Sequence, residues 1–509
     1  MQRPRAVGES RGRVRTSSMK QAIFGLGVLG VVGLQGCKVT GEDIDYWKGT
    51  VKGPGKIVAV MLADKYPLEL RTQAALALVA MDRNDRDVIG DLQAALARLG
   101  EEGRAQLIAN LVPGIESQLQ IKDPKGEAYT TRTQARAKDA AFLLVAQAPT
   151  EVKAKLTADV VGWYLEDFNG RALAGNYSAE QVVRALGSPG AKVLVKGLRA
   201  DLPPQALVKM SQLIAQVADP AARKEAGSTL VAIEREMESP AFLKKMHALV
   251  AEQSAKSPDQ KLDAKKLNAA AAMNRDIFVN DGALPALKWL SDEPAVKARL
   301  LDIASDKSLK DDAGKVRRAR ALGALEGRVT SADLSKVLEL ALDEANPPEV
   351  RDYAFDRVGD IRSPQALDKL WPLVASSSDE RLRWRAGELV LSIGGVQVLG
   401  ELMKKLPAGA DFESEELEGY AQRIGQFTPP PSETMQHMLQ DPAWFARVIA
   451  LRYFERKGTG APDVAAVSAL TGDAAPTKGK RWGKLRSVGS VAEDVSTSLK
   501  QRLAQPGTP

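Results

Sequence analysis

Apolar residues recur at helical spacing along most of this chain. From Pro54 onward, segments whose apolar positions return every three or four residues alternate with short breaks that contain proline, glycine or aspartate. The segments 68–81, 87–99 and 101–119 follow this pattern, whereas the strict apolar–polar alternation of a half-buried strand is scarce. The pattern therefore predicts an all-α protein.

A short motif repeats along these helical segments. An apolar residue is followed by arginine, two further positions and then alanine or glycine, and the seven copies begin at Leu70, Val183, Ala222, Ala319, Val350, Leu382 and Ala446. The copies at 319, 350 and 382 are 31 and 32 residues apart, 446 lies 64 residues beyond 382, and Leu417-Glu418…Ala421 fits the gap. Since positions i and i+4 share one helix face, the apolar and the small residue form a seam that a neighbouring helix can approach closely. The arginine lies about 100° further round the helix, at the edge of that face.

The stretch 346–367 (NPPEVRDYAFDRVGDIRSPQAL) resembles a HEAT or HEAT-like repeat. In that family the second helix of a pair opens with an acidic or amide cap, then Val-Arg, then a small residue. The resemblance implies an α-solenoid of stacked antiparallel helix pairs, a superhelix in which arginine and aspartate link neighbouring repeats. It covers about residues 300–455 well and the stretches near 64–80 and 219–235 in part. An irregular all-helical protein and a tetratricopeptide array stay open as alternatives.

The N-terminal segment has the features of an export signal. Met19-Lys20 precedes an apolar run of twelve residues, 23–34, which is shorter than the roughly 20 residues a bilayer-spanning helix needs. The sequence Leu34-Gln35-Gly36-Cys37 that follows resembles the lipobox of bacterial lipoproteins, although a small residue is commoner where Gln35 stands. The resemblance implies that residues 1–36 are a leader, with Met19 the favoured start, and that lipid is attached to Cys37. A simple transmembrane anchor is the alternative.

Charge and cysteine content narrow the remaining classes of function. The net charge is +7, but residues 1–36 hold six basic residues against the single Glu9, so only +2 belongs to the rest of the chain. We therefore expect no nucleic-acid partner, because phosphate binding needs a concentrated basic surface. Cys37 is the only cysteine, which excludes an internal disulfide and a cysteine-based zinc site.

No motif for catalysis or cofactor binding stands out. His247 and His437 are the only histidines, and neither has a second type of metal ligand at ligand spacing. The glycine pattern at 25–30 matches the dinucleotide fingerprint in letters, but it lies inside the leader without the required strand and helix. We expect no catalytic residue, no metal and no cofactor, and we assign Trp371, Trp384 and Trp444 to the core.

The expected organisation has six parts. They are the export leader (1–36), the lipidated cysteine with a short tether (37–53), an N-terminal helical-repeat lobe (54–253), a polar joint (254–274), a C-terminal HEAT-like lobe (275–470) and a basic flexible tail (471–509).

These features favour a membrane-anchored lipoprotein that acts as a non-catalytic scaffold for protein partners in the bacterial cell envelope. One alternative is an envelope enzyme or enzyme accessory. The other is a peptidoglycan- or lipid-binding module that uses the basic stretch 478–486 around Trp482. Lys38 stands where an aspartate would retain many lipoproteins in the inner membrane, so we favour the periplasmic face of the outer membrane. The inner membrane and the cell surface stay open.

Overall fold

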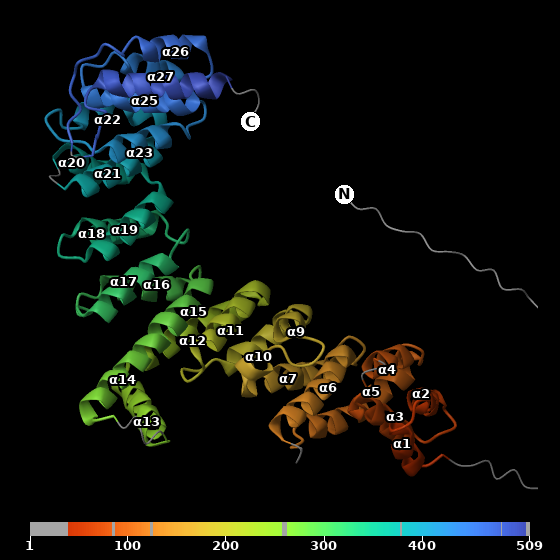
Figure 1. The fold of residues 1–509 in the computed structure, drawn as a ribbon. Coiled ribbons are helices and arrows are strands. Elements are labelled where there is room, and N and C mark those ends of the chain that lie inside the picture. The colour runs from red at the N-terminus through yellow and green to blue at the C-terminus, as the bar shows by residue number, and fades with distance from the viewer. Residues whose placement is uncertain are drawn as a thin grey trace, which may run out of the picture.

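The computed structural model describes residues 39–83, 87–122, 126–256, 262–376, 379–479 and 481–504. Over these ranges the chain forms helices and no strand, apart from one isolated antiparallel bridge between Pro476 and Ser487. The helices stack one on the next into a long body that bends sharply once (Figure 1). The expected all-α solenoid of stacked helix pairs is confirmed.

The N-terminal arm comprises the first twelve helices and runs from the N-terminal end to the bend (Figure 1). Its helices are α1 (Gly41–Lys48), α2 (Gly53–Leu62), α3 (Leu68–Ala80), α4 (Val88–Leu96), α5 (Glu101–Leu119), α6 (Glu127–Val145), α7 (Thr150–Glu166), α8 (Phe168–Arg171), α9 (Ala179–Leu186), α10 (Ser188–Gly197), α11 (Pro204–Val217) and α12 (Pro220–Glu238). Contacts pass from α3 to α5, α6, α7, α10 and α11 in turn, so each helix is covered by the next.

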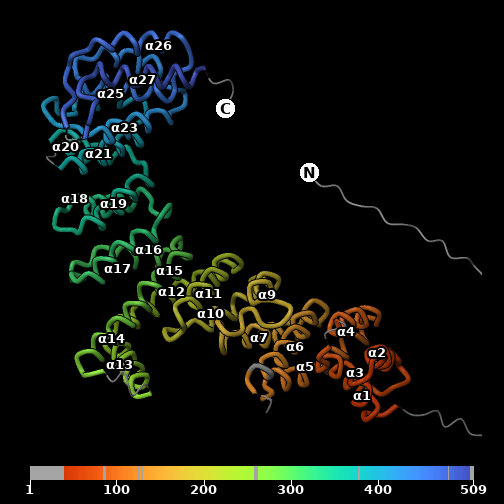
Figure 2. Tube along the Cα trace, in the orientation of Figure 1, coloured from red at the N-terminus to blue at the C-terminus, as the bar shows by residue number. Residues whose placement is uncertain are grey.

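The bend is built by a projecting hairpin and a continuous run of helix. The corner hairpin consists of α13 (Pro240–Lys256) and α14 (Ala264–Ile277), and the Cα trace shows it leaving the outer side of the bend (Figure 2). After α14 the chain continues through a π-helix, η2 (Phe278–Ala283), into α15 (Leu284–Trp289). Residues 254–274, expected to form a polar joint, thus include the end of α13 and most of α14. The division into two lobes stays a prediction.

The C-terminal arm rises from the bend as a row of helix pairs (Figure 1). Its helices are α16 (Pro294–Ser305), α17 (Asp312–Ala324), η3 (Ser331–Asp333), α18 (Leu334–Leu342), α19 (Pro348–Ile361), η4 (Pro364–Ala366), α20 (Leu367–Ser376), α21 (Glu380–Gly394), η5 (Gly395–Val398), α22 (Leu399–Lys405), α23 (Ser414–Ile424), α24 (Ser432–Met438), α25 (Trp444–Lys457), α26 (Ala461–Ser468) and α27 (Val488–Ala504). The second helices of the pairs, α17, α19, α21, α23, α25 and α27, contact one another in sequence. Residues 380–405 are also long and apolar enough to cross a membrane by length and composition, but they belong to this packed row.

The repeated motif supplies the seam of that row. Val350 and Ala354 in α19, like Ala446 and Ala450 in α25, are fully buried, which confirms the i, i+4 seam. The arginine of the motif behaves differently from one helix to the next. Arg320 is exposed and pairs with Asp281, whereas Arg383 is 3% exposed and donates to Glu416 and to the carbonyl of Asp411. The edge position expected for this arginine is therefore wrong for Arg383.

Glycines next to the seam let aromatic side chains of the following helix come close. A Cβ at Gly323 in α17 would lie 3.4 Å from Cε1 of Tyr353 in α19. A Cβ at Gly387 in α21 would lie 2.7 Å from Cε1 of Tyr420 in α23, which is closer than real Cβ contacts. Tyr420 is fully buried, so its ring has no free space to move into.

The expected tether is wrong for residues 41–48, because they form α1. Thr40 and Asp43 build a capping box, in which the Thr40 side chain accepts from the Asp43 amide and the Asp43 carboxylate accepts from the Thr40 amide. Ile44 is fully buried against the neighbouring helices. Eight residues with one buried position are too short to show helical periodicity in the sequence.

The expected flexible tail is also wrong for the described residues after 471. Trp482 is buried, its Nε1 donates to the carbonyl of Phe412 at 2.9 Å, and its ring packs edge-on against Trp444. Residues 488–504 form α27, which packs on α25 and buries Val491, Val495 and Leu499. The basic residues around Trp482 hid this contact, because its partner lies 70 residues away.

Replacing Gly387 should destabilise the solenoid. In Gly387→Ala the new methyl group collides with the Tyr420 ring, and we expect a loss of about 1–3 kcal/mol in the free energy of unfolding, measured by urea denaturation. Gly162→Ala in α7 is the control, because nothing lies within 4 Å of a Cβ there. Alanine replaces a glycine within a helix, so this control should be unchanged or about 0.5–1 kcal/mol more stable. An unchanged Gly387→Ala would contradict the close packing.

Candidate functional site at the corner

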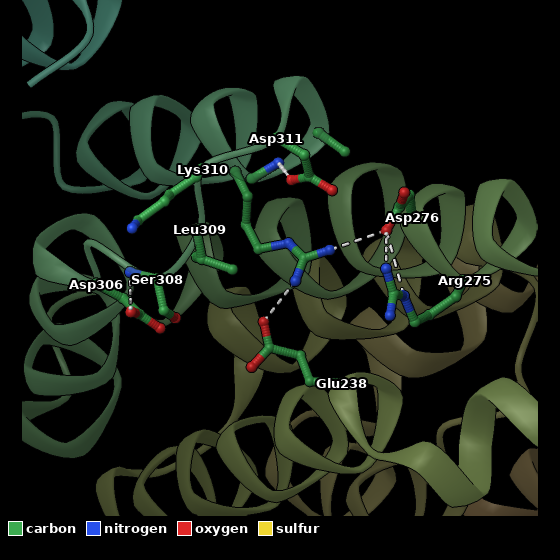
Figure 3. A pocket seen from close by; sticks show the side chains of 11 residues that line it. Glu238, Arg275, Asp276, Asp306, Ser308, Leu309, Lys310 and Asp311 are labelled. Atoms are coloured by element: carbon green, nitrogen blue, oxygen red, sulfur yellow. Dashed lines mark hydrogen bonds and ion pairs between the residues drawn. The ribbon is translucent and has the colours of Figure 1, made fainter.

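Six charged side chains meet where the two arms join. Arg317 of α17 donates to Glu238 of α12 at 2.7 Å and to Asp276 of α14 at 3.0 Å (Figure 3). Asp276 also accepts from Arg275 at 2.9 Å. Arg299 of α16 binds Glu234 of α12 through two hydrogen bonds, of 2.6 and 2.9 Å, and reaches Glu238 at 2.8 Å. We call these residues (Glu234, Glu238, Arg275, Asp276, Arg299 and Arg317) the corner network, and it ties α12, α14, α16 and α17 together.

The corner network is shielded from water at its centre. Glu234 is completely buried and Arg317 nearly so. Burial raises the pKa of the Glu234 carboxyl, and the two bonds from Arg299 oppose that rise. Burial acts to lower the pKa of Arg299, but the carboxylates of Glu234 and Glu238 outweigh it and raise that pKa. Burying a charged side chain without an oppositely charged partner is costly, so each member of the corner network depends on its ion pairs.

A hollow of about 500 Å³ opens beside the network. Glu238, Arg275 and Asp276 lie on one side of it and the turn before α17 on the other (Figure 3), and Arg317 also lines it. Side-chain carboxylates hold that turn: the Ser308 amide donates to the Asp306 carboxylate, and the Gly314 amide donates to the carboxylate of Asp311, which caps α17. Hydrogen bonding from Ser308 lowers the pKa of the Asp306 carboxyl.

Two further hollows continue from the first. One of about 450 Å³ shares Asp276 and Ala313 with it, and one of about 320 Å³ shares Asn280 and Arg320 with the second. We call the three together the corner groove. We call the second and third hollows the outer hollows, because they lie beyond the corner network. They are lined by Ala269, Ala272, Met273, Asp276, Ile277, Asn280, Asp281, Leu284, Pro285, Lys288, Ala313, Arg320, Gly323, Ala324, Glu326 and Tyr353.

Apolar side chains stand exposed along this groove. Met273 is 66% exposed, and Ile277, one turn later on α14, is 38% exposed. Tyr353 of α19, which lines the third hollow, is 42% exposed. Single exposed apolar residues are ordinary, whereas a group of them along one groove is less common on the surface of a folded chain.

The π-helix η2 forms part of the groove wall. Asn280 in η2 is 9% exposed, its carbonyl accepts from Arg320 at 2.6 Å, and its buried side-chain oxygen has no hydrogen-bond partner. Short π-helical turns within α-helices occur frequently at functional sites. The wide turn and the unpaired amide oxygen both fall where the two outer hollows meet.

A separate hollow of about 810 Å³ lies in the N-terminal arm beside Lys138 and Asp139 of α6. Burial lowers the pKa of Lys138 and raises that of Asp139, and their ion pair opposes both shifts. Lys138 also donates to the carbonyls of Ala174 and Tyr177, at 3.1 and 2.6 Å, and Asp139 accepts from the Asn176 amide at 2.6 Å. The charged groups of Lys138 and Asp139 are therefore used in hydrogen bonds that hold the loop between α8 and α9.

The residues singled out from the sequence are distributed as follows. Cys37 and the leader 1–36 lie outside the described residues. His247 is in α13 and His437 in α24, and the described part of the chain contains no group of three potential His, Cys, Asp or Glu metal ligands. Trp444 is buried, and Trp371 and Trp384 are partly buried against the core, as expected.

Sequence reasoning missed the corner network and the corner groove. Arg299 lies 65 residues from Glu234, and Arg317 lies 79 residues from Glu238. Nothing in the local pattern links such distant charges. The only signal was the exposed face of residues 269–277, where Met273 and Ile277 are four residues apart.

Comparisons with known proteins do not identify a family for this chain. No protein-family model and no curated protein sequence matches the chain. Similar solved structures include the karyopherin Kap121p bound to the SUMO protease Ulp1p, with a TM-score of 0.34 and 14% identity over 92% of this chain and 46% of that one. Importin beta in an ammonium sulfate condition gives a TM-score of 0.26 and 12% identity, over 91% and 68% of the two chains. This chain spans about half the length of the Kap121p chain.

Breaking one partner of the corner network should cost more than removing a whole pair. Glu234→Leu leaves Arg299 without its two-bond partner, and we expect a loss of about 3–5 kcal/mol in the free energy of unfolding. In the double variant Glu234→Leu with Arg299→Met, Glu238 keeps Arg317 as its partner, so stability should return close to that of the original protein. Urea denaturation of both single variants and the double variant measures the coupling. A double variant as unstable as the sum of the singles would argue against this network.

Proposed function

We propose that this protein is a lipid-anchored, non-catalytic scaffold of a bacterial cell envelope, and that its corner groove binds a segment of a protein partner. The observation that carries the proposal is the exposed apolar lining of the groove, Met273 and Ile277 in its second hollow and Tyr353 in its third. Solenoids present extended surfaces of this kind to partner chains.

The partner segment that fits is an amphipathic helix with an uncharged apolar face. Met273 and Ile277 lie one turn apart on α14, so they are spaced to contact apolar residues of a helix laid along the corner groove. The charged side chains of the two outer hollows are already paired within the chain, as Arg320 with Asp281, Lys288 with Glu326, and Asp276 with Arg317. A charged segment would have to compete with these pairs, whereas an apolar one leaves them in place.

The buried titratable groups support a role without chemistry. Glu234, Lys138 and Asp139 have perturbed pKa values, but each is bonded to groups of its own chain. The alternative, a tail that binds peptidoglycan or lipid, used Trp482 as an exposed aromatic side chain. Trp482 is instead buried and donates to the carbonyl of Phe412. Both observations favour the scaffold.

The anchoring part of the proposal rests on the lipobox-like sequence Leu34-Gln35-Gly36-Cys37 and the apolar run before it. Two or three acyl chains on one residue would hold the protein stably at a membrane, where a single chain holds it only marginally. The outer membrane, periplasmic face, is the proposed location, on the basis of Lys38.

Cys37→Ser should abolish lipid attachment and cleavage of the leader. Mass spectrometry of the purified protein should show the unprocessed mass, and the membrane fraction should no longer contain lipidated protein. Gln35→Ala, which brings the sequence closer to the common lipobox, is the matched control and should be processed normally. Finding no lipid on the original protein would refute the anchor.

Charged residues in the corner groove should weaken partner binding. A photo-crosslinking amino acid at Tyr353 identifies the partner in cells, and calorimetry then measures binding of the purified partner segment. Met273→Glu with Ile277→Glu should weaken binding at least about tenfold, because apolar side chains buried at the contact contribute about 1.5–3 kcal/mol each. Leu173→Glu is the control, since Leu173 is 85% exposed on the N-terminal arm. Equal weakening by the control, or none by the groove variant, would count against the groove.

A further inference from the structure

The folded body of this protein begins almost directly after Cys37. Val39 packs against the core, Thr40 caps α1, and Ile44 in the middle of α1 is fully buried. Only Lys38 separates Cys37 from Val39. The capping box and the buried isoleucine fix α1 to α2 and α3, so it cannot serve as a loose connection.

This short connection limits how far the body can stand from a bilayer. A chain spans at most about 3.3–3.6 Å per residue, so the Cα atoms of Cys37 and Val39 are no more than about 7 Å apart. The polar layer on each side of a bilayer is about 5–7 Å thick. A diacylated Cys37 therefore brings α1 to the level of the lipid headgroups.

The surface that reaches this level has the composition of a membrane interface. Tyr46 in α1 is 73% exposed, and Val51 in the loop between α1 and α2 is 81% exposed. Lys52 and Lys56 are also exposed, and the Lys56 ammonium lies 5.0 Å from the centre of the Trp47 ring. Aromatic and lysine side chains together are typical of the headgroup region, where the ring is half immersed and the amine meets phosphate.

α1 has three acidic residues, Glu42, Asp43 and Asp45, and Glu42 is exposed. Three lysines on α1, the loop and α2 (Lys48, Lys52 and Lys56) balance these charges, so the surface as a whole is close to neutral. The Asp43 carboxylate accepts from the Thr40 amide at 2.8 Å, and Asp45 pairs with Lys48 at 2.6 Å. An α-helix of eight residues is about 12 Å long, so α1 lying flat would place Tyr46 and Val51 on the bilayer close to the anchor.

We propose that α1 and the α1–α2 loop form a membrane-contact surface that lies on the phospholipid headgroups. The inference rests on the proposed lipid attachment at Cys37. The N-terminal end of the solenoid then rests on the bilayer, and the corner groove lies at the other end of the N-terminal arm (Figure 1).

The test uses the full lipidated protein in vesicles of phosphatidylethanolamine and phosphatidylglycerol. A lipidated Cys37 has no free thiol, so Val51→Cys provides a unique site for an environment-sensitive fluorophore, and Leu173→Cys provides the matched control. Both positions are exposed, so neither substitution removes a packed side chain. We expect a blue shift and quenching by brominated lipid for the probe at 51, and a water-exposed spectrum without quenching for the probe at 173.

The outcomes separate the two proposals. Vesicle flotation with a water-exposed probe at 51 would overturn the membrane-contact surface and leave the lipid anchor intact. Failure to float, with no lipid mass on Cys37, would overturn both. In a second variant, Val51→Asp with Lys52→Glu, the protein should still float, but a probe at Tyr46→Cys should become water-exposed. An unchanged signal in that variant would also contradict the contact.

Discussion

No helix pair of this protein can bury its apolar face alone, and the whole molecule depends on each pair being covered by the next. The buried side chains accordingly form one continuous cluster from Ile44 in α1 to Leu499 in α27. Small residues make this stacking possible, because Ala354, Ala450 and Gly387 let the next helix approach. The two ends need covers of their own. At the C-terminal end, α27 lies over α25, and Trp482 closes the aromatic group of Phe412 and Trp444.

The corner is the place where apolar stacking is supplemented by charge. The seam changes direction between α12 and α16, and the corner network joins these helices to α14 and α17 through Glu234, Arg299 and Arg317. A buried ion pair adds little net stability compared with an apolar contact, but it requires defined geometry. The corner network therefore contributes more to fixing the angle of the bend than to the stability of the fold. The corner groove lies beside this network, so its two walls are held at a set separation.

The sequence was sufficient for features that depend on nearby residues. The i, i+4 pairs Val350–Ala354 and Ala446–Ala450 and the spacing of 31–32 residues predicted the helix row of the C-terminal arm, and the structure confirms it. It was insufficient for contacts made between distant residues. The contacts Glu234–Arg299, Glu238–Arg317 and Phe412–Trp482 join residues 65, 79 and 70 apart, and Asn280–Arg320 in the groove joins residues 40 apart, separations that local periodicity does not encode. The capped helix α1 was missed for the opposite reason, since eight residues give too short a pattern.

The length of the N-terminal arm is set by the number of helix layers stacked in it. Packed helices lie about 8–10 Å apart, so each added layer between α1 and α14 contributes a fixed increment of length. With α1 resting on a bilayer as proposed, the number of layers in the N-terminal arm would set the distance between the membrane anchor and the corner groove. A homologue with one helix pair more or less in that arm would present the same groove at a different distance from the anchor, and so would suit envelopes of different width.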